Sequence, residues 1–209
     1  MKALPKTLTG LVLLAGMGLA STAEAALISR LGGLAVYDAD RNLTWLANAN
    51  ANGLMNWTAA NTWAAGLNVG GYTGWRLPTT LQPDPSCSSQ SGGDSYGYNC
   101  TGSELGHLFY TEGGLTLGQS ITSSAVLSNL FINMQNSVYW SGTEYAPNPV
   151  NAWYFYTSSG YQSYDVKVNN NYAWAVRSGD VAAVPEPGEM GLLGIGALAW
   201  AGTRARRRG

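Results

Sequence analysis

The residues that could carry out acid–base chemistry are carboxylates in the second half of the chain: Glu104, Glu112, Glu144 and Asp165. Two such groups facing each other across a cleft would hydrolyse a glycosidic bond, and their separation would decide the stereochemical course. The sequence does not indicate which two would meet, so a polysaccharide-active hydrolase remains an alternative. The single histidine, His107, has no nucleophile elbow to serve, and we expect an ordinary residue on a helix surface. We therefore predict no catalytic residues and a protein that is not an enzyme.

Two short strings resemble calcium ligands. The Asp-x-Asp-x-Asn string at 38–42 is typical of the start of a calcium loop, but Leu43 stands where Gly is needed and Ala49 where Glu is needed. A turn is the better interpretation. Gln82-Pro83-Asp84 spells a tripeptide of galactose-selective C-type lectins, but the partner W-N-D string is missing. We interpret it as a chance match, and we predict no metal and no cofactor.

Tyrosines beside polar loops are the best candidates for binding. Exposed phenol rings next to Asn, Asp and Ser can stack on sugar rings and hydrogen-bond to their hydroxyls. The candidates are Tyr96, Tyr98, Tyr145, Tyr161 and Tyr164. The alternative is that they are turn and edge-strand tyrosines without a ligand.

The N-terminus has the pattern of a secretory signal peptide. Lys2 and Lys6 precede an apolar run at 8–20, and Ala23-Glu24-Ala25 forms an A-x-A cleavage site. We predict a signal peptide at 1–25, a mature chain that begins at Ala26, and export of the domain at 26–184.

The C-terminus combines Pro185-Glu186-Pro187 with an apolar run at 191–202 and a basic end at 204–208. As a helix the apolar run would rise about 18 Å, short of the roughly 30 Å hydrocarbon core of a bilayer. The segment 185–209 resembles a PEP-CTERM sorting signal. That resemblance implies exosortase as a partner and a transient transmembrane association before sorting to the surface or matrix. The alternative is a weak anchor that is never cut.

Composition restricts the partners of the predicted mature domain. The two predicted signals contain six of the eleven basic and three of the twelve acidic residues, which leaves five and nine and a net charge near −4. Nucleic-acid binding needs clustered Lys and Arg, so none is predicted. Cys87 and Cys100 are the two cysteines, and in an exported chain we expect one disulfide. A redox or metal pair is the alternative.

The local patterns predict a single α+β domain with two short helices and an antiparallel sheet. Apolar runs at 34–37 and 43–46 flank a turn, and Asn56 can cap a helix through Leu67. The T-x-x-E box at 101–104 predicts a second helix, which ends at Gly113-Gly114. Four runs with strand periodicity form a predicted meander: 138–140, 150–156, 161–168 and 172–176.

Three motifs, in order, resemble the Lcl C-terminal-type domain, a family of bacterial surface domains. They are W-R-L-P-T at 75–79, E-L at 104–105, and Y-W-S-x-T-E at 139–144 followed by A-W at 152–153 and V-R at 176–177. The resemblance implies an exported, non-catalytic module that binds surface glycans. The motifs are also similar in style to C-type-lectin-like folds. Because the domain is acidic, a sulfated polyanion is not the expected ligand. A structural matrix component without a specific ligand is the alternative.

The motif residues are predicted to be structural rather than ligand-binding. Trp75, Trp140, Trp153 and Trp174 are expected in the core, because large aromatic rings dominate core burial. Arg76, Glu144 and Arg177 are rare charges within apolar motifs. We expect Arg76 or Arg177 to pair with Glu144 in a partly buried ion pair; three solvated side chains are the alternative.

Overall fold

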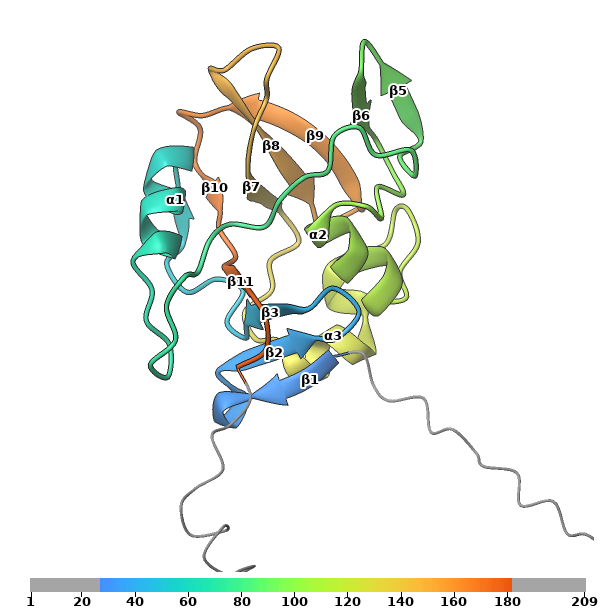
Figure 1. The fold of residues 1–209 in the computed structure, drawn as a ribbon. Coiled ribbons are helices and arrows are strands. Elements are labelled where there is room, and N and C mark those ends of the chain that lie inside the picture. The colour runs from blue at the N-terminus through green and yellow to red at the C-terminus, as the bar shows by residue number, and fades with distance from the viewer. Residues whose placement is uncertain (1–26, 182–209) are drawn as a thin grey trace, which may run out of the picture.

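The computed structural model describes residues 27–181. In space, this part of the chain forms two sheets, one at each end of the molecule (Figure 1). The first sheet contains, in order, β1 (Leu27–Arg30), β2 (Ala35–Asp38), β3 (Leu43–Leu46) and β11 (Val176–Ser178). The second contains β4 (Leu54–Met55), β10 (Asn171–Tyr172), β7 (Val138–Glu144), β8 (Asn151–Tyr156) and β9 (Tyr161–Val166). A separate hairpin joins β5 (Ser89–Ser91) and β6 (Asp94–Tyr96). The α+β prediction is confirmed.

The predicted N-terminal hairpin is confirmed as strands β2 and β3. Ala35 pairs with Leu46 and Asp38 with Leu43, which leaves a short turn between the strands. Asn42 occupies the left-handed region in this turn, with φ 50°, a conformation that asparagine tolerates better than most residues. A one-turn 3₁₀ helix, η1 (Leu31–Gly33), connects β1 to β2.

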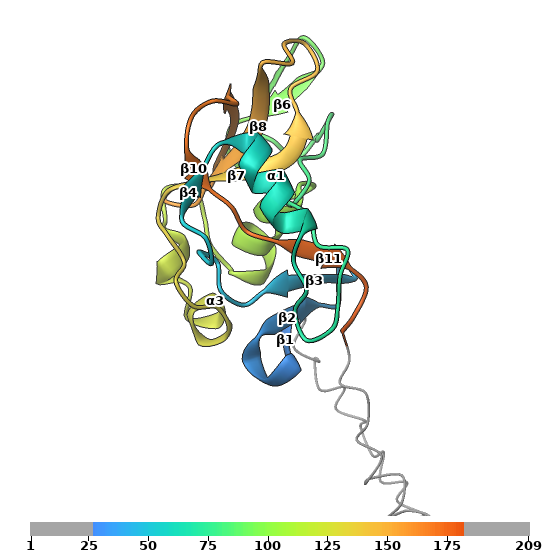
Figure 2. The same ribbon diagram turned by 90° about the vertical axis from the view of Figure 1, so that its left-hand side faces the viewer.

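The predicted meander is confirmed for β7, β8 and β9, which pair in sequence as antiparallel neighbours. It is wrong for the last run, 172–176, because that run is divided between the two sheets. β10 crosses to the other side of β7 and pairs with it in parallel, whereas β11 pairs with β3 in the first sheet. The C-terminal segment from β10 to β11 therefore runs from the second sheet to the first and joins them into one domain (Figure 2).

The first predicted helix is confirmed as α1 (Trp57–Ala65), which ends two residues before the predicted Leu67. The side chain of Asn56 accepts a hydrogen bond from the backbone N–H of Ala59 at 2.9 Å, as expected of an N-cap. The indole of Trp57 donates to the Ser141 carbonyl at 2.8 Å. This bond attaches α1 to β7, beside which the helix lies (Figure 2).

The second predicted helix exists, but its predicted capping box is wrong. α2 (Glu104–Gly106) begins after Ser103, which makes no side-chain cap hydrogen bond, and it continues as a π-helical turn, η2 (His107–Glu112). The carboxylate of Glu104 binds residues elsewhere instead of closing the box. Leu105, Leu108 and Phe109 are buried as predicted.

A third helix was not predicted from the sequence. α3 (Ala125–Leu130) follows the 3₁₀ turn η3 (Ile121–Ser123), and Ser124 caps it by accepting from the Leu127 N–H at 3.3 Å. The helix is six residues long, too short to show a periodic apolar stripe.

The prediction that the motif tryptophans form the core is confirmed. Trp75, Trp140, Trp153 and Trp174 all have an exposed fraction of 2% or less. The indole of Trp174 donates to the Leu46 carbonyl at 2.7 Å and that of Trp140 to the Met55 carbonyl at 3.0 Å. These bonds satisfy polar groups that would be costly to bury alone.

Candidate functional site

A pocket of about 300 Å³ is lined by tyrosines and short polar side chains from the β5–β6 hairpin, strand β9 and the segment after β7. The lining residues are Ser91, Asp94, Tyr96, Tyr145, Tyr161, Ser163 and Tyr164. Four of the five candidate tyrosines are therefore brought together. The fifth, Tyr98, is not among the lining residues; it contacts Tyr161 edge-on, with ring centroids 5.0 Å apart.

The hairpin is attached to the edge of the second sheet by backbone hydrogen bonds. Gly97 donates to the Gln162 carbonyl at 2.9 Å and accepts from the Gln162 N–H at 2.8 Å. Gln162 is buried, and its side chain donates to the Ser95 carbonyl at 3.2 Å. Because side chains alternate along a strand, Tyr161 and Ser163 lie on one face of β9, and Gln162 and Tyr164 lie on the other. Tyr161, Ser163 and Tyr164 all line the pocket, which therefore receives side chains from both faces of this edge strand.

The predicted disulfide between Cys87 and Cys100 is confirmed, and it closes the segment that carries the hairpin. Gln82 holds the same segment from outside the loop. Its amide donates to the Ser95 carbonyl at 2.7 Å and accepts from the Ser95 N–H at 2.7 Å. The backbone N–H of Asp84 donates to the Ser95 hydroxyl at 2.8 Å. The crosslink and these bonds position Asp94 and Tyr96 against β9.

Two of the pocket tyrosines stack on each other. The rings of Tyr145 and Tyr164 are nearly parallel, 9° apart, with centroids separated by 3.9 Å. The buried ring of Trp153 contacts both edge-on, at 5.5 and 5.7 Å. The Tyr145 hydroxyl donates to Asp94 Oδ2 at 2.8 Å, and this hydrogen bond raises the pKa of Tyr145. The Tyr164 side chain remains 40% exposed and accessible to a ligand.

The pocket offers aromatic faces and hydroxyl groups with little charge. Of the described residues that line it, Asp94 carries the single carboxylate and none is basic. The two serines and the tyrosine hydroxyls can donate and accept hydrogen bonds. Such a surface suits an uncharged, polar ligand that has one apolar face.

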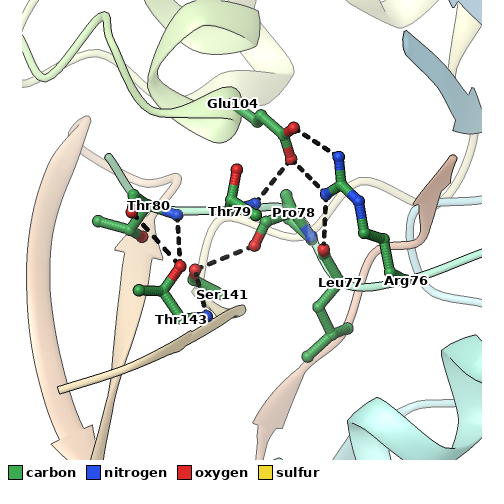
Figure 3. A network of polar contacts seen from close by, with 8 residues as sticks. All are labelled: Arg76, Leu77, Pro78, Thr79, Thr80, Glu104, Ser141 and Thr143. Atoms are coloured by element: carbon green, nitrogen blue, oxygen red, sulfur yellow. Dashed lines mark hydrogen bonds and ion pairs between the residues drawn. The ribbon is translucent and has the colours of Figure 1, made fainter. Parts of the chain in front are cut away.

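The predicted pairing of Arg76 or Arg177 with Glu144 is wrong. Arg76 instead binds Glu104 through its two terminal guanidinium nitrogens, Nη1 and Nη2, at 2.7 Å each (Figure 3). The Glu104 carboxylate also accepts from the Thr79 N–H at 2.7 Å. Arg76 and Glu104 lie in different motifs, and their partnership depends on how α2 packs beside the loop at 76–80.

The motifs W-R-L-P-T and Y-W-S-x-T-E meet directly at β7. The Ser141 hydroxyl donates to the Pro78 carbonyl at 2.9 Å, and the Thr80 N–H donates to the Thr143 hydroxyl at 2.9 Å (Figure 3). The Gly142 N–H donates to the same Pro78 carbonyl at 2.8 Å. Residues of β7 therefore supply the hydrogen-bond partners of the backbone at Pro78 and Thr80, where the loop has no strand partner.

The two remaining motif charges have other partners. Glu144 pairs with Lys167, and the Lys167 ammonium also lies 4.2 Å from the ring centroid of Trp57. The Arg177 guanidinium donates to the Thr73 carbonyl at 3.2 Å and lies over a tyrosine ring, that of Tyr72.

The four carboxylates considered for hydrolysis are engaged separately. Glu104 binds Arg76, Glu144 binds Lys167, and Asp165 accepts hydrogen bonds from the side chain of Asn169 at 2.9 and 3.0 Å. Glu112 contacts His107. Among the residues lining the pocket, none of these four is present.

The two strings that resemble calcium ligands make internal hydrogen bonds. Asp84 is 1% exposed; its Oδ1 accepts from the Ser86 N–H at 3.0 Å and its Oδ2 from the Gly102 N–H at 2.9 Å. Asp38 Oδ1 accepts from the Arg41 N–H at 3.0 Å and closes the turn between β2 and β3. The interpretation of 38–42 as a turn is confirmed.

The prediction for His107 is wrong: the side chain is buried, not on the helix surface. Its Nε2 lies 3.0 Å from Glu112 Oε1 and 3.9 Å from Asp38 Oδ2. Burial, with the charges of Asp38 and Asp40, raises the pKa of Glu112 to about 7. Burial also raises the pKa of Asp38 and, with the nearby Arg41, lowers that of His107. Sequence reasoning missed this cluster because Asp38 lies in β2, far from η2 along the chain, and because an α-helical pattern does not align His107 with Glu112.

Comparison with known proteins identifies one matching family. Residues 34–177 match the Lcl C-terminal domain, a range that includes the pocket and most of both sheets. No curated protein matches the chain. Between residues 27 and 181, no helix is both long enough and apolar enough to span a bilayer. The predicted signal peptide at 1–25 and the sorting segment at 185–209, with Pro185, Glu186 and Pro187, lie outside the described residues.

Proposed function

This chain belongs to the Lcl C-terminal domain family, a family of surface and extracellular proteins, and we propose that it is a non-catalytic module that binds polysaccharide outside the cell. The observation that carries the proposal is the tyrosine pocket between the disulfide-closed hairpin and β9. Its size, about 300 Å³, is at the lower end of the range of roughly 300–1,000 Å³ for small-molecule sites. A pocket of this size would take a short part of a glycan chain.

The ligand that fits the pocket is a neutral sugar. Sugar rings present an apolar face of C–H groups and a rim of hydroxyls, which complement tyrosine rings and the hydroxyls of Ser91 and Ser163. The carboxylate of Asp94 can accept from a sugar hydroxyl, whereas it would repel a sulfate or carboxylate group. We therefore favour a neutral, hydroxyl-rich polysaccharide, such as the producer's own exopolysaccharide, over a sulfated one.

The proposed location follows from the two ends of the sequence. A signal peptide at 1–25 would export the chain, and the segment 185–209 would direct it to an exosortase after a transient stay in the membrane. The product would lie at the cell surface or in the extracellular matrix. The disulfide supports this location, because disulfides persist in oxidising compartments.

The test is binding of the purified protein to the producer's exopolysaccharide and to a broad glycan panel, with calcium and with chelator. Substitutions Tyr145→Ala and Tyr164→Ala should each weaken binding by at least about 2- to 12-fold, since an aromatic contact contributes about 0.5–1.5 kcal/mol beyond its buried area. Tyr37→Ala, a half-buried tyrosine in the first sheet, is the matched control and should leave binding unchanged.

Two outcomes would contradict the proposal. Saturable binding that survives both pocket substitutions would place the glycan site elsewhere. No binding to any glycan would favour the alternative, a structural matrix component without a specific ligand. Binding that is lost with chelator would instead add a metal ion to the proposed site.

A further inference from the structure

A buried cluster of three possible metal ligands lies where the turn after β2 meets the π-helical turn η2. The cluster consists of Asp38, His107 and Glu112, and one ligand atom from each lies within 4.8 Å of the others. His107 Nε2 is 3.0 Å from Glu112 Oε1 and 3.9 Å from Asp38 Oδ2. The cluster shares no residue with the tyrosine pocket.

The backbone of η2 brings two of the ligands together. In a π-helix residues five apart lie one turn from each other, and His107 and Glu112 are the first and last residues of this turn. The Gly113 N–H donates to the Leu108 carbonyl at 2.9 Å, a bond with the five-residue spacing of a π-helix. In an α-helix the same two residues would diverge around the axis, so the unusual turn aligns them. Such turns occur often at functional sites.

The third residue, Asp38, has a buried carboxylate oxygen without a hydrogen-bond partner among the described residues. Asp38 is fully buried, and among the described residues its Oδ2 has no hydrogen-bond partner, whereas Oδ1 accepts from the Arg41 N–H. The guanidinium of Arg41 does not fill this role, because it donates to the Thr101 carbonyl at 2.5 Å. A buried carboxylate oxygen without a partner is strongly unfavourable. Oδ2 therefore points to an atom that the protein itself does not supply.

A proton shared within the cluster does not account for all three residues. Nε2 of His107 can hold one proton, and its nearer neighbour is Glu112 Oε1, not Asp38. If that proton binds Glu112, Asp38 Oδ2 stays unpaired next to a second carboxylate. A divalent cation would neutralise both carboxylates and use the lone pair of the neutral imidazole at the same time.

We propose that Asp38, His107 and Glu112 bind one divalent transition-metal ion, with Zn²⁺ as the best fit, which clamps the β2–β3 turn onto η2. Bonds of about 2.0–2.2 Å at tetrahedral angles place ligand atoms roughly 3.3–3.6 Å apart, between the 3.0 and 3.9 Å seen here. The imidazole ligand favours zinc and related ions over Ca²⁺ and Mg²⁺, which prefer oxygen ligands throughout. The side chains are 0–9% exposed, so they would largely shield the ion from solvent, and three protein ligands leave one tetrahedral position for water.

The experiment uses the full-length chain without a polyhistidine tag, stripped with chelator and titrated with Zn²⁺, Mn²⁺, Ca²⁺ or Mg²⁺. His107 is the only histidine of the chain, so a ¹⁵N-histidine label gives one imidazole whose NMR signals report on this site alone. We expect one Zn²⁺ per chain by calorimetry and a shift of the Nε2 resonance that is complete at one equivalent. At a free Zn²⁺ concentration 100-fold above Kd, the midpoint temperature of thermal unfolding should rise by about 5–10 °C.

Three variants separate the site from adventitious binding. Asp38→Asn keeps the acceptor for the Arg41 N–H, and Glu112→Gln keeps the shape of the side chain. Each should weaken Zn²⁺ binding by more than about tenfold, since even changes behind a metal ligand cost 10–100-fold. Glu144→Gln removes an exposed carboxylate that pairs with Lys167 and should leave Zn²⁺ binding unchanged. If Asp38→Asn does not fold, Glu112→Gln and the imidazole signal of the unaltered chain still show whether Zn²⁺ binds at this cluster.

Several results would overturn the proposal. These are no stoichiometric transition-metal binding, binding that leaves the His107 signals unmoved, or affinity that survives in Glu112→Gln. A shift of the imidazole signals by Ca²⁺ or Mg²⁺ in preference to Zn²⁺ would overturn the choice of ion. Because the pocket shares no residue with the cluster, loss of glycan binding in Tyr145→Ala would not affect these readouts.

Discussion

Replacing Glu104 with glutamine should destabilise the domain far more than the same change at Glu144. The Glu104 carboxylate accepts three hydrogen bonds of 2.7 Å, two from the Arg76 guanidinium and one from the Thr79 N–H. Its side chain is 12% exposed and that of Arg76 is 36% exposed. Glutamine keeps the shape but loses the charge, and its amide N–H₂ would face the guanidinium.

The expected loss follows from this partial burial. Removing one partner of a fully buried ion pair costs about 3–5 kcal/mol. Water can reach part of Arg76 and compensate, so we expect Glu104→Gln to lower the free energy of unfolding by about 2–3 kcal/mol. The Glu144 side chain is 48% exposed, and loss of its pair with Lys167 should cost less than about 1 kcal/mol.

The assay is urea unfolding of the disulfide-bonded protein, followed by tryptophan fluorescence. The Glu104→Gln variant should also unfold about 5–10 °C lower on heating. In an Arg76→Met background the same change should cost at least about 1 kcal/mol less, because residues in contact are energetically coupled. Equal losses for Glu104→Gln and Glu144→Gln, or no coupling to Arg76, would refute the reasoning.

Three further predictions concern the disulfide, the domain ends and one glycine. Replacing Cys87 and Cys100 with serine should cost about 3 kcal/mol of unfolding free energy, the loop-closure value for a separation of 13 residues, measured by urea unfolding. Arg30 lowers the pKa of Asp180, so this pair stabilises the domain above the ordinary pKa of 3.8 and less as pH falls through the lowered value. The unaltered protein should therefore exceed Asp180→Asn in unfolding free energy by less than about 1 kcal/mol at pH 7, and this difference should vanish in acid. In Gly106→Ala the added Cβ would overlap the Cys100 carbonyl, and we expect a loss of folded protein by circular dichroism.

Each of these has a contradicting result. Unchanged stability without the disulfide would mean that the bonds of Gln82 to Ser95 hold the hairpin alone. A stability difference for Asp180→Asn that persists in strong acid would exclude the ion pair as its cause. Gly142→Ala is the control for the glycine, because its added Cβ meets Leu77 Cβ at 3.4 Å, and it should fold. Normal folding of both alanine variants would contradict the close approach at Gly106.

Features that depend on neighbours in the chain were predicted correctly from the sequence. The β2–β3 hairpin, helix α1 with its Asn56 cap, and the β7–β9 meander arise from local alternation, capping and turn residues. The disulfide required no geometry, because the chain has two cysteines. The burial of the motif tryptophans followed from their size and apolar character, whatever elements surround them.

Tertiary structure alone decided how separate segments meet. The partner of Arg76 depends on α2 packing beside the loop at 76–80, and sequence spacing holds no information on that contact. The division of 172–176 between two sheets depends on free edges at β7 and β3. His107 lines up with Glu112 through a five-residue turn that an α-helical pattern does not reveal.

The tyrosine pocket combines both kinds of information. Residue type and polar neighbours were enough to choose the five candidate tyrosines, because stacking and hydrogen bonding are properties of the side chain itself. Their arrangement, with four lining one pocket and Tyr98 beside it, depends on the docking of Gly97 against Gln162. Chemical capacity is local and was determined by the sequence, whereas the convergence of side chains is a long-range result of folding that only the tertiary structure decided.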